Sequence, residues 1–421
     1  MAGVLKLRNW LFETKAGSRI ALLACILWIA CLPFSMAQQI RFTSIFLFSI
    51  LGGFLIHGFS HGFDFYRVSF PDFRRLLPMA LLALLPLLHF IPEGYNLREL
   101  TLQAPLLFIP WILMLFRSNW PESFPKIAVA VLFLSFISLC FLLLLQGPQT
   151  VWNSVRSEVE IPDLFILARP QMGFLAGLLF FLTDQTFKLH RNRLLYGLSF
   201  AFTALILLWI LAKIALISFL LVMLLLQIWK LRKRPLVFAG IAGFFVVCAL
   251  GAVLFASKTG ILAQAFSRGG LPFDQYPKAY VNSINSRLVL WQAGFQVLGE
   301  GNNLFAGVPS ELLQPKLDAA VGSLNAYLEG RHLNPHNQFL YLLLHYGIPG
   351  LIVFCMFWFG LFRMSSVSAP LAGLWIFAFC CSQTEIYLDR EFGSQLYLLL
   401  LVLSIQFQPS QLPDSPAGNV G

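Results

Sequence analysis

The sequence predicts an all-α protein that crosses a membrane about twelve times and has one large loop outside the cytoplasm. Hydrophobic residues make up 58% of the 421 positions and charged residues only 11%, whereas an ordinary globular domain has about 25% charged residues. Many hydrophobic residues fall in runs of about 17 or more, the length that a spanning helix requires. Most Lys and Arg residues lie in short loops between these runs, which is typical of a polytopic membrane protein.

Twelve apolar runs qualify as membrane spans. If the N-terminus is cytoplasmic, the cytoplasmic face holds more than half of the 29 Lys and Arg residues and few of the 19 acids. This asymmetry has the sign of the positive-inside rule. The expected spans lie near residues 20–36, 42–58, 75–91, 102–117, 126–145, 169–184, 194–210, 213–230, 235–256, 347–363, 369–385 and 394–408.

The run from 194 to 230 is too long for one span. Lys213 is its one interruption, so we divide the run there and expect a tight turn at the membrane surface. A charge between two apolar stretches is a functional candidate by default. The alternative is that Lys213 only fixes the end of its helix.

The spans divide the chain into four parts. Residues 1–256 hold the first nine spans, and residues 257–346 form the large external loop with two or three short helices. Residues 347–408 hold the last three spans. Residues 409–421 are rich in Pro, Ser and Gly and are expected to form a disordered cytoplasmic tail.

His336 is the strongest candidate for acid–base chemistry. Asn334 can cap a helix here, and Pro335 suits its first position. His336 would then lie in the first turn, where the helix dipole disfavours an extra proton, so a neutral imidazole could act as a general base. The same helix end favours an anion such as phosphate. The alternative is a histidine that only caps the helix or holds the loop.

Four basic residues are candidates for anion binding. Arg287 shares a helix face with Trp291, four positions later, and a guanidinium suits a bidentate grip on phosphate. Arg169 stands at the outer end of the sixth span. Together with Lys213 and Arg331, these residues could form a cationic pocket that stabilises a diphosphate leaving group. The alternative is that the arginines only snorkel to the membrane surface.

No metal site, cofactor or nucleic-acid partner is expected. Asp389 and Glu391 form an acid-x-acid pair, but an ion pair with Arg390 between them is the simpler interpretation. A proline separates His332 from His336 and breaks the helix that a zinc pair would share. The seven Cys residues form no CxxC pair, and the net charge of +10 is mostly explained by the loops between spans.

Three motifs in the second half of the chain form a set. They are an Arg-x-x-x-Trp segment from Arg287 to Trp291, a turn followed by Phe305-Ala306-Gly307-Val308-Pro309, and Pro335-His336-Asn337-Gln338-Phe339-Leu340 leading to Gly347-Ile348-Pro349-Gly350-Leu351. In this order, within and after a long external loop, they resemble the O-antigen ligase and polymerase superfamily of bacterial envelope glycosyltransferases. The resemblance covers about residues 165–365.

The resemblance implies a GT-C-like fold in the bacterial inner membrane, with its active site on the periplasmic side. It also implies metal-independent, inverting transfer of a glycan from undecaprenyl diphosphate to an acceptor hydroxyl. His336 matches the essential histidine of the family, as a base or as a group that orients the acceptor. Arg287 matches the loop arginine that grips the diphosphate.

The remaining site residues match less closely. Lys213 stands where the family usually has Arg, and Arg169 matches another basic residue at the outer mouth. Asn337 and Trp291 are expected to support the acceptor or the loop.

Within the superfamily, twelve spans and a short tail favour the ligase, which joins O-antigen to the lipid A–core oligosaccharide. The polymerase, which extends O-antigen itself, often has two external Arg-rich loops, whereas only one external loop is large in this chain. A transporter or flippase of lipid-linked glycan is a further alternative, although Lys213 is the one clear charge within an apolar stretch and no inverted repeat is visible.

Overall fold

The computed structural model describes the chain as a bundle of helices. The described residues are 16–38, 42–61, 77–78, 80–89, 105–112, 121, 123–145, 169–210, 212–231, 283–326, 328, 330, 332–365, 368–388 and 391–407, and they contain helices and turns but no strand. The all-α prediction is confirmed for this part of the chain. The expected span 235–256 and the tail 409–421 lie outside the described residues.

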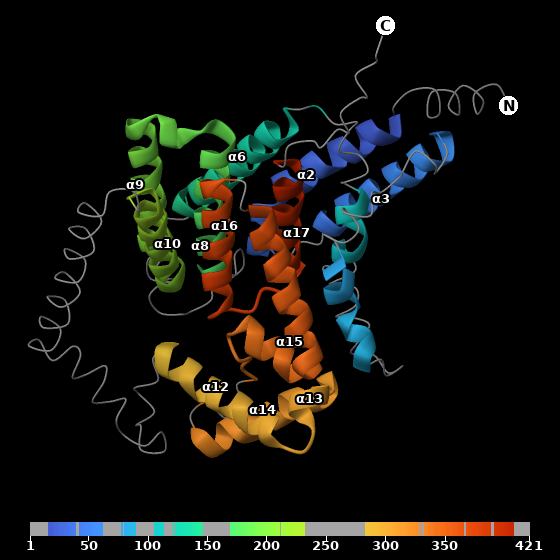
Figure 1. Cartoon of the computed structure of the whole chain (residues 1–421), viewed down its shortest axis with the longest axis vertical. Coiled ribbons are helices and arrows are strands. Elements are labelled where there is room, and N and C mark those ends of the chain that lie inside the picture. Colours follow the sequence, from blue (N-terminus) through green and yellow to red (C-terminus); the bar gives the residue numbers. More distant parts are fainter. Residues whose placement is uncertain are drawn as a thin grey trace, which may run out of the picture.

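The first half of the bundle contains α2 (Ala16–Gln38), α3 (Phe42–His61), the 3-10 helix η2 (Leu85–His89) and α6 (Phe124–Leu145). Helix α2 packs along α3 and also contacts α6. Figure 1 shows α2 and α3 together on the right of the molecule, whereas α6 extends from α2 toward the upper left.

The central helices are α8 (Arg169–Phe187), α9 (Arg193–Trp209) and α10 (Lys213–Leu231), with the 3-10 turn η4 (Leu189–Arg191) between the first two. The predicted division at Lys213 is confirmed, because α9 ends at Trp209 and α10 begins at Lys213. Helix α8 packs against α6, α9, α10 and α16 (Ala369–Ser382). Phe181, Phe219 and Phe377 form aromatic contacts at its core.

The remaining helices are α15 (Gln338–Ser365) and α17 (Glu391–Gln406) in the bundle, and α12 (Ser283–Gly299), α13 (Asn303–Ala306) and α14 (Ser310–Leu324) outside it. We call α12, α13 and α14 the cap layer. The cap layer lies across the end of the bundle where α15 begins (Figure 1). It accounts for three short helices in the region expected to be the external loop.

Two described helices, Phe124–Leu145 and Gln338–Arg363, are long and apolar enough to span a membrane by length and composition alone. Shorter apolar helices occupy Ser18–Phe34, Ile45–Ile56, Arg193–Trp209, Ile214–Trp229, Ala369–Ser382 and Gly393–Ser404. The structure thus contains helices that could cross a bilayer, and the total of twelve spans remains a prediction.

Candidate functional site

Arg287 lies on the face of α12 that is turned toward the bundle. Its Nη2 donates to Glu385 Oε1 at 2.7 Å, and its Nε donates to the Thr384 carbonyl at 3.3 Å. The side chains of Arg287 and Glu385 are only 18% and 15% exposed. Arg287 therefore joins the cap layer to the loop between α16 and α17 instead of extending into open solvent.

His336 contacts the other oxygen of the same carboxylate. Its Nδ1 lies 3.3 Å from Glu385 Oε2, and its side chain is 30% exposed. The Glu385 carboxylate thus bridges Arg287 and His336, the two residues that the sequence ranked first. These three side chains form the candidate site.

The expected position of His336 within a helix is wrong. Helix α15 begins at Gln338, and His336 precedes it with a left-handed φ of 45°. The Asn337 side chain provides the cap, because its Oδ1 accepts from the backbone N–H groups of Phe339 and Leu340. Asn334 instead accepts from the His336 N–H. His336 therefore does not lie in the first turn of a helix, and the helix dipole gives no reason to expect a neutral imidazole there.

Trp291 fixes the segment that carries His336. Its Nε1 donates to the Pro335 carbonyl at 2.9 Å, from one turn beyond Arg287 on α12. This contact is consistent with the predicted role of Trp291 in supporting the loop. One helix face fixes both the guanidinium and the backbone beside the imidazole.

Gln338 fastens the loop that carries Glu385. Its side chain is fully buried, and its Oε1 accepts from the backbone N–H groups of Tyr387 and Leu388 at 2.8 and 2.9 Å. Because Gln338 follows His336 by two residues, this contact fixes both partners of the imidazole–carboxylate pair. The sequence interpretation did not single out Gln338.

Glu385 was also missed from the sequence. Burial raises the pKa of its carboxyl, but the hydrogen bond from His336 and the charges of His336 and Arg287 outweigh burial and hold that pKa below its ordinary value. The expected span 369–385 included this residue, whereas α16 ends at Ser382. An acid at the edge of an apolar run was the one available signal.

Arg169 and Lys213 are the first residues of two neighbouring helices, α8 and α10. Near these starts the helices approach closely, because a Cβ on Gly173 would come within 2.5 Å of Ala212 Cβ and 2.9 Å of Ala215 Cβ. The backbones of the two basic residues therefore lie in the same region of the bundle.

This region adjoins the candidate site. Phe174, in the second turn of α8, stacks on Tyr387 with ring centroids 4.5 Å apart. Tyr387 follows Glu385 by two residues, so the starts of α8 and α10 and the Glu385 loop share one end of the bundle, beside the cap layer (Figure 1). Arg331 lies outside the described residues.

The glycine motifs meet in one backbone contact beside the site. Gly307 and Gly347 both have positive φ, 79° and 62°. A Cβ on Gly347 would collide with the Phe305 carbonyl, and a Cβ on Gly307 would collide with the His345 carbonyl. Val308 N–H also donates to the Leu344 carbonyl at 2.7 Å. These two motifs therefore dock the cap layer onto α15.

His332 does not lie with His336. Its Nδ1 is 2.6 Å from Asp318 on α14, and its side chain is 74% exposed. Among the described residues, no group of three or more His, Cys, Asp or Glu is arranged to hold a metal ion. Asp389, Arg390 and the side chain of Glu391 lie outside the described part of the chain.

Comparison with known proteins is consistent with the motif set. No curated protein matches the chain. Residues 198–355 match the model of a family described as O-antigen ligase. That segment includes Lys213, Arg287 and His336, whereas Arg169 and Glu385 lie outside it. This family covers both O-antigen ligases and polymerases, which are membrane-embedded, glycosyltransferase-like enzymes of polysaccharide biosynthesis. The resemblance seen in the sequence is therefore confirmed, and the match over residues 198–355 is consistent with an O-antigen ligase-type protein.

Proposed function

We propose that the chain is an O-antigen ligase of the bacterial inner membrane. It would transfer O-antigen polysaccharide from undecaprenyl diphosphate to a hydroxyl of the lipid A–core oligosaccharide, on the periplasmic side. The observation that supports this most strongly is the Glu385 carboxylate between Arg287 and His336. It puts an anion-binding group and a proton acceptor at one point beside the cap layer.

The imidazole supplies the base. A carboxylate can only accept a hydrogen bond, so His336 Nδ1 carries the proton in its contact with Glu385. In the neutral ring, Nε2 then has a free lone pair and can accept a proton from the acceptor hydroxyl. Glu385 thus orients His336 and selects the tautomer that a general base requires. This geometry favours a base over a group that only orients the acceptor.

The guanidinium binds the leaving group. Arg287 has five N–H donors in a planar fork, so it can contact the Glu385 carboxylate and a phosphate oxygen together. We propose that Lys213, Arg169 and Arg331 add positive charge around the same diphosphate. Cationic groups already in place stabilise the developing charge without a metal ion and without rearrangement.

The reaction is a single displacement. The acceptor oxygen attacks the anomeric carbon while the bond from that carbon to the diphosphate oxygen breaks. The hydroxyl proton passes to His336 Nε2, and the bonding electron pair leaves with the diphosphate. One displacement inverts the anomeric configuration, and Asn337 and Trp291 support the loop on which the base stands.

An O-antigen polymerase is the alternative, because the matching family includes both activities. The same site would then receive the end of another O-antigen chain as acceptor. A lipid-linked glycan transporter is a further and weaker alternative. It would move the donor across the bilayer without forming a new glycosidic bond.

An assay with purified protein distinguishes these functions. Lipid-linked O-antigen is incubated with lipid A–core, with a second O-antigen acceptor, or with no acceptor, each with and without chelator. The ligase predicts a covalent O-antigen–core product that chelator does not suppress. Longer lipid-linked glycan alone would indicate a polymerase, and donor movement without a product would indicate a transporter.

Two site variants test the chemistry. His336→Ala should abolish transfer, and Arg287→Ala should lower donor use by roughly 10-fold to 100-fold, because a hydrogen bond to a charged group contributes about 1.5–3 kcal/mol. Full activity in either variant would remove that residue from the mechanism.

Matched controls lie in the same part of the molecule. His332→Ala removes another histidine that contacts a carboxylate at a left-handed position. Lys316→Ala removes another cation in a 2.7 Å ion pair, here with Glu300. Both control variants should keep wild-type transfer, which separates the site from a general need for these residue types.

A further inference from the structure

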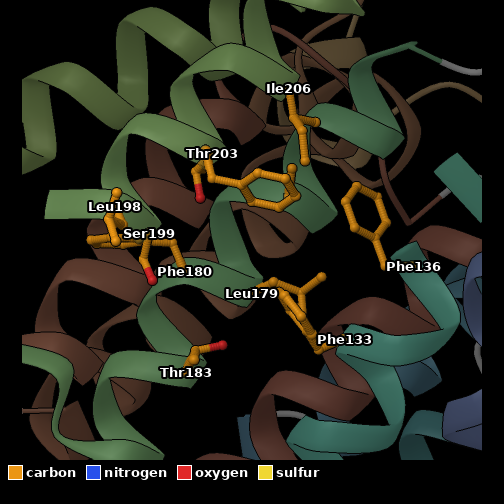
Figure 2. Close-up of a pocket in the computed structure, with 11 residues that line it drawn as sticks. Phe133, Phe136, Leu179, Phe180, Thr183, Leu198, Ser199, Thr203 and Ile206 are labelled. Carbon is orange, nitrogen blue, oxygen red and sulfur yellow. The ribbon is translucent and has the colours of Figure 1, made fainter. Parts of the chain in front are cut away.

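A groove runs along the side of the bundle between α6, α8 and α9 (Figure 2). Its volume is about 290 Å³, near the lower end of the range for small-molecule pockets. Leu179 and Phe180 of α8 form its buried floor, whereas Phe133 of α6 and Phe202 of α9 are 37% and 43% exposed at its edges. The groove is therefore an apolar channel on the outside of the bundle.

Three hydroxyl groups interrupt this apolar lining. Thr183, Ser199 and Thr203 all line the groove (Figure 2). The Thr183 hydroxyl is buried and has no hydrogen-bond partner among the described residues. A buried polar atom without a partner is costly, above all where lipid takes the place of water. An occupant with an acceptor oxygen would satisfy it.

A cationic turn lies at one end of the groove. Lys188, Arg191 and Arg193 are all exposed in and beside the turn between α8 and α9, and no described carboxylate forms an ion pair with them. The nearby Asp184 is occupied, because it accepts from both the backbone N–H and the Nδ1 of His190 at 2.8 Å.

The spacing matches an amphiphile. Thr183 lies four residues, about 6 Å, before the end of α8, and Ser199 follows Arg193 by six residues, about 9 Å, along α9. Thr203 lies about 15 Å from Arg193 on the same helix, deeper in the groove. From Thr183 the groove continues to Ala176, about 10 Å farther along α8. Cations, hydroxyls and hydrocarbon thus follow one another in the order of a phospholipid's phosphate, ester and acyl regions.

We propose that this groove is a binding site for an anionic phospholipid. One acyl chain lies between α6 and α9, the Thr183 and Ser199 hydroxyls donate to ester oxygens, and the phosphate contacts the turn between α8 and α9. Three cations that form no ion pair with an acid in the described part of the chain favour a headgroup with net negative charge over a zwitterionic one. The turn lies at the end of the bundle away from the cap layer (Figure 1), so this lipid is separate from the glycan donor.

Native mass spectrometry of the full chain tests the site. The delipidated protein is mixed with phosphatidylglycerol or with phosphatidylcholine of the same chain length, and the lipid-bound fraction is compared. Phosphatidylglycerol should bind more tightly. Arg191→Gln should weaken that binding about five-fold, because one basic residue near an anionic headgroup contributes about that factor. Ser199→Phe should abolish it by filling the groove.

Each variant has a matched control. Arg19→Gln removes an exposed cation on α2, and Ile217→Phe enlarges a side chain on α10 that is 65% exposed. Both should bind as the wild type does. Thr183→Val keeps the side-chain shape and should weaken binding a few-fold, which tests the groove even if Ser199→Phe does not fold. Equal binding of the two lipids, or full binding by Arg191→Gln and Thr183→Val, would overturn the proposal.

Discussion

The Glu385 carboxylate lies between the Arg287 guanidinium and the His336 imidazole, and each contact has its own consequence. The 2.7 Å contact with Arg287 joins α12 to the loop between α16 and α17. The contact with His336 Nδ1 orients the ring. An ionised carboxylate is required for both, and its lowered pKa keeps it ionised in slightly acidic conditions.

The stabilising effect of Glu385 should therefore depend on pH in a defined direction. Its pKa in the folded protein is lower than the ordinary 4.5, so its contribution is complete above 4.5 and is lost as pH falls through the folded value. At neutral pH, Glu385→Gln should lower the free energy of unfolding by about 1–3 kcal/mol. This difference should shrink as pH falls below 4.5. Thermal unfolding in detergent at a series of pH values measures it.

Glu300→Gln is the control for that measurement. Glu300 also forms a 2.7 Å ion pair, with Lys316, but its side chain is 55% exposed. Solvent screens such a pair, so its loss should change stability little at any pH. If Glu385→Gln behaved like Glu300→Gln, the carboxylate bridge would not contribute to the fold of the site.

At the scale of elements, backbone contacts at two glycines join the cap layer to α15, beside a buried apolar cluster that includes Leu340 and Leu344 of α15. Gly347 breaks α15 with φ 62° and ψ −159°, and this break receives the chain at Phe305–Gly307. The glycines are needed because a Cβ at either contact would strike a carbonyl. The motifs that contain Gly307 and Gly347 therefore determine how the cap layer docks onto α15.

Gly347→Ala should separate the cap layer from α15. The backbone of Gly347, with positive φ and extended ψ, is essentially restricted to glycine and costs a residue with a Cβ about 1–3 kcal/mol. The Phe305 carbonyl also leaves no space for the added methyl group. Both thermal stability and transfer activity should fall. Gly360→Ala, in the same helix but with nothing within 4 Å of its Cβ, should leave activity unchanged and raise helix stability by roughly 0.5–1 kcal/mol. Equal behaviour of the two variants would contradict the docking role of Gly347.

The observed helix boundaries agree with the predicted ones where a single residue in the sequence marked the boundary. Lys213 marks the start of α10 as expected, because a single charge ended an otherwise apolar run. At the start of α15 the sequence predicted Asn334 as the cap, whereas Asn337 was expected to support the acceptor or the loop. The structure uses Asn337, because His336 has a left-handed backbone and the helix begins three residues later than expected.

At the scale of the molecule, hydropathy predicts which segments are helices but not which faces meet. Arg287 and His336 could be expected together because both belong to one motif set in one loop. Glu385 lies 98 positions beyond Arg287, and its partner depends on how the cap layer packs against the end of α16. Gln338 likewise acts through the backbone of a loop nearly 50 residues away, which no local pattern encodes.

The two ends of the bundle should face opposite sides of the membrane. The cap layer and the candidate site lie at one end, and the basic turn between α8 and α9 lies at the other (Figure 1). The positive-inside rule places that turn in the cytoplasm. Gln296→Cys, on the exposed face of α12, should therefore react with a membrane-impermeant thiol reagent in intact spheroplasts. Leu194→Cys, at a position 71% exposed beside the turn, should react only after lysis.

The unsubstituted chain measures the background from the native cysteines, among which Cys355 is exposed. Both engineered sites lie on helix surfaces, so their accessibility in lysed membranes should be similar. The reverse labelling pattern would place His336 and Arg287 in the cytoplasm. A ligase acts on an acceptor that has already crossed the inner membrane, so that result would exclude the proposed reaction even if the carboxylate bridge were intact.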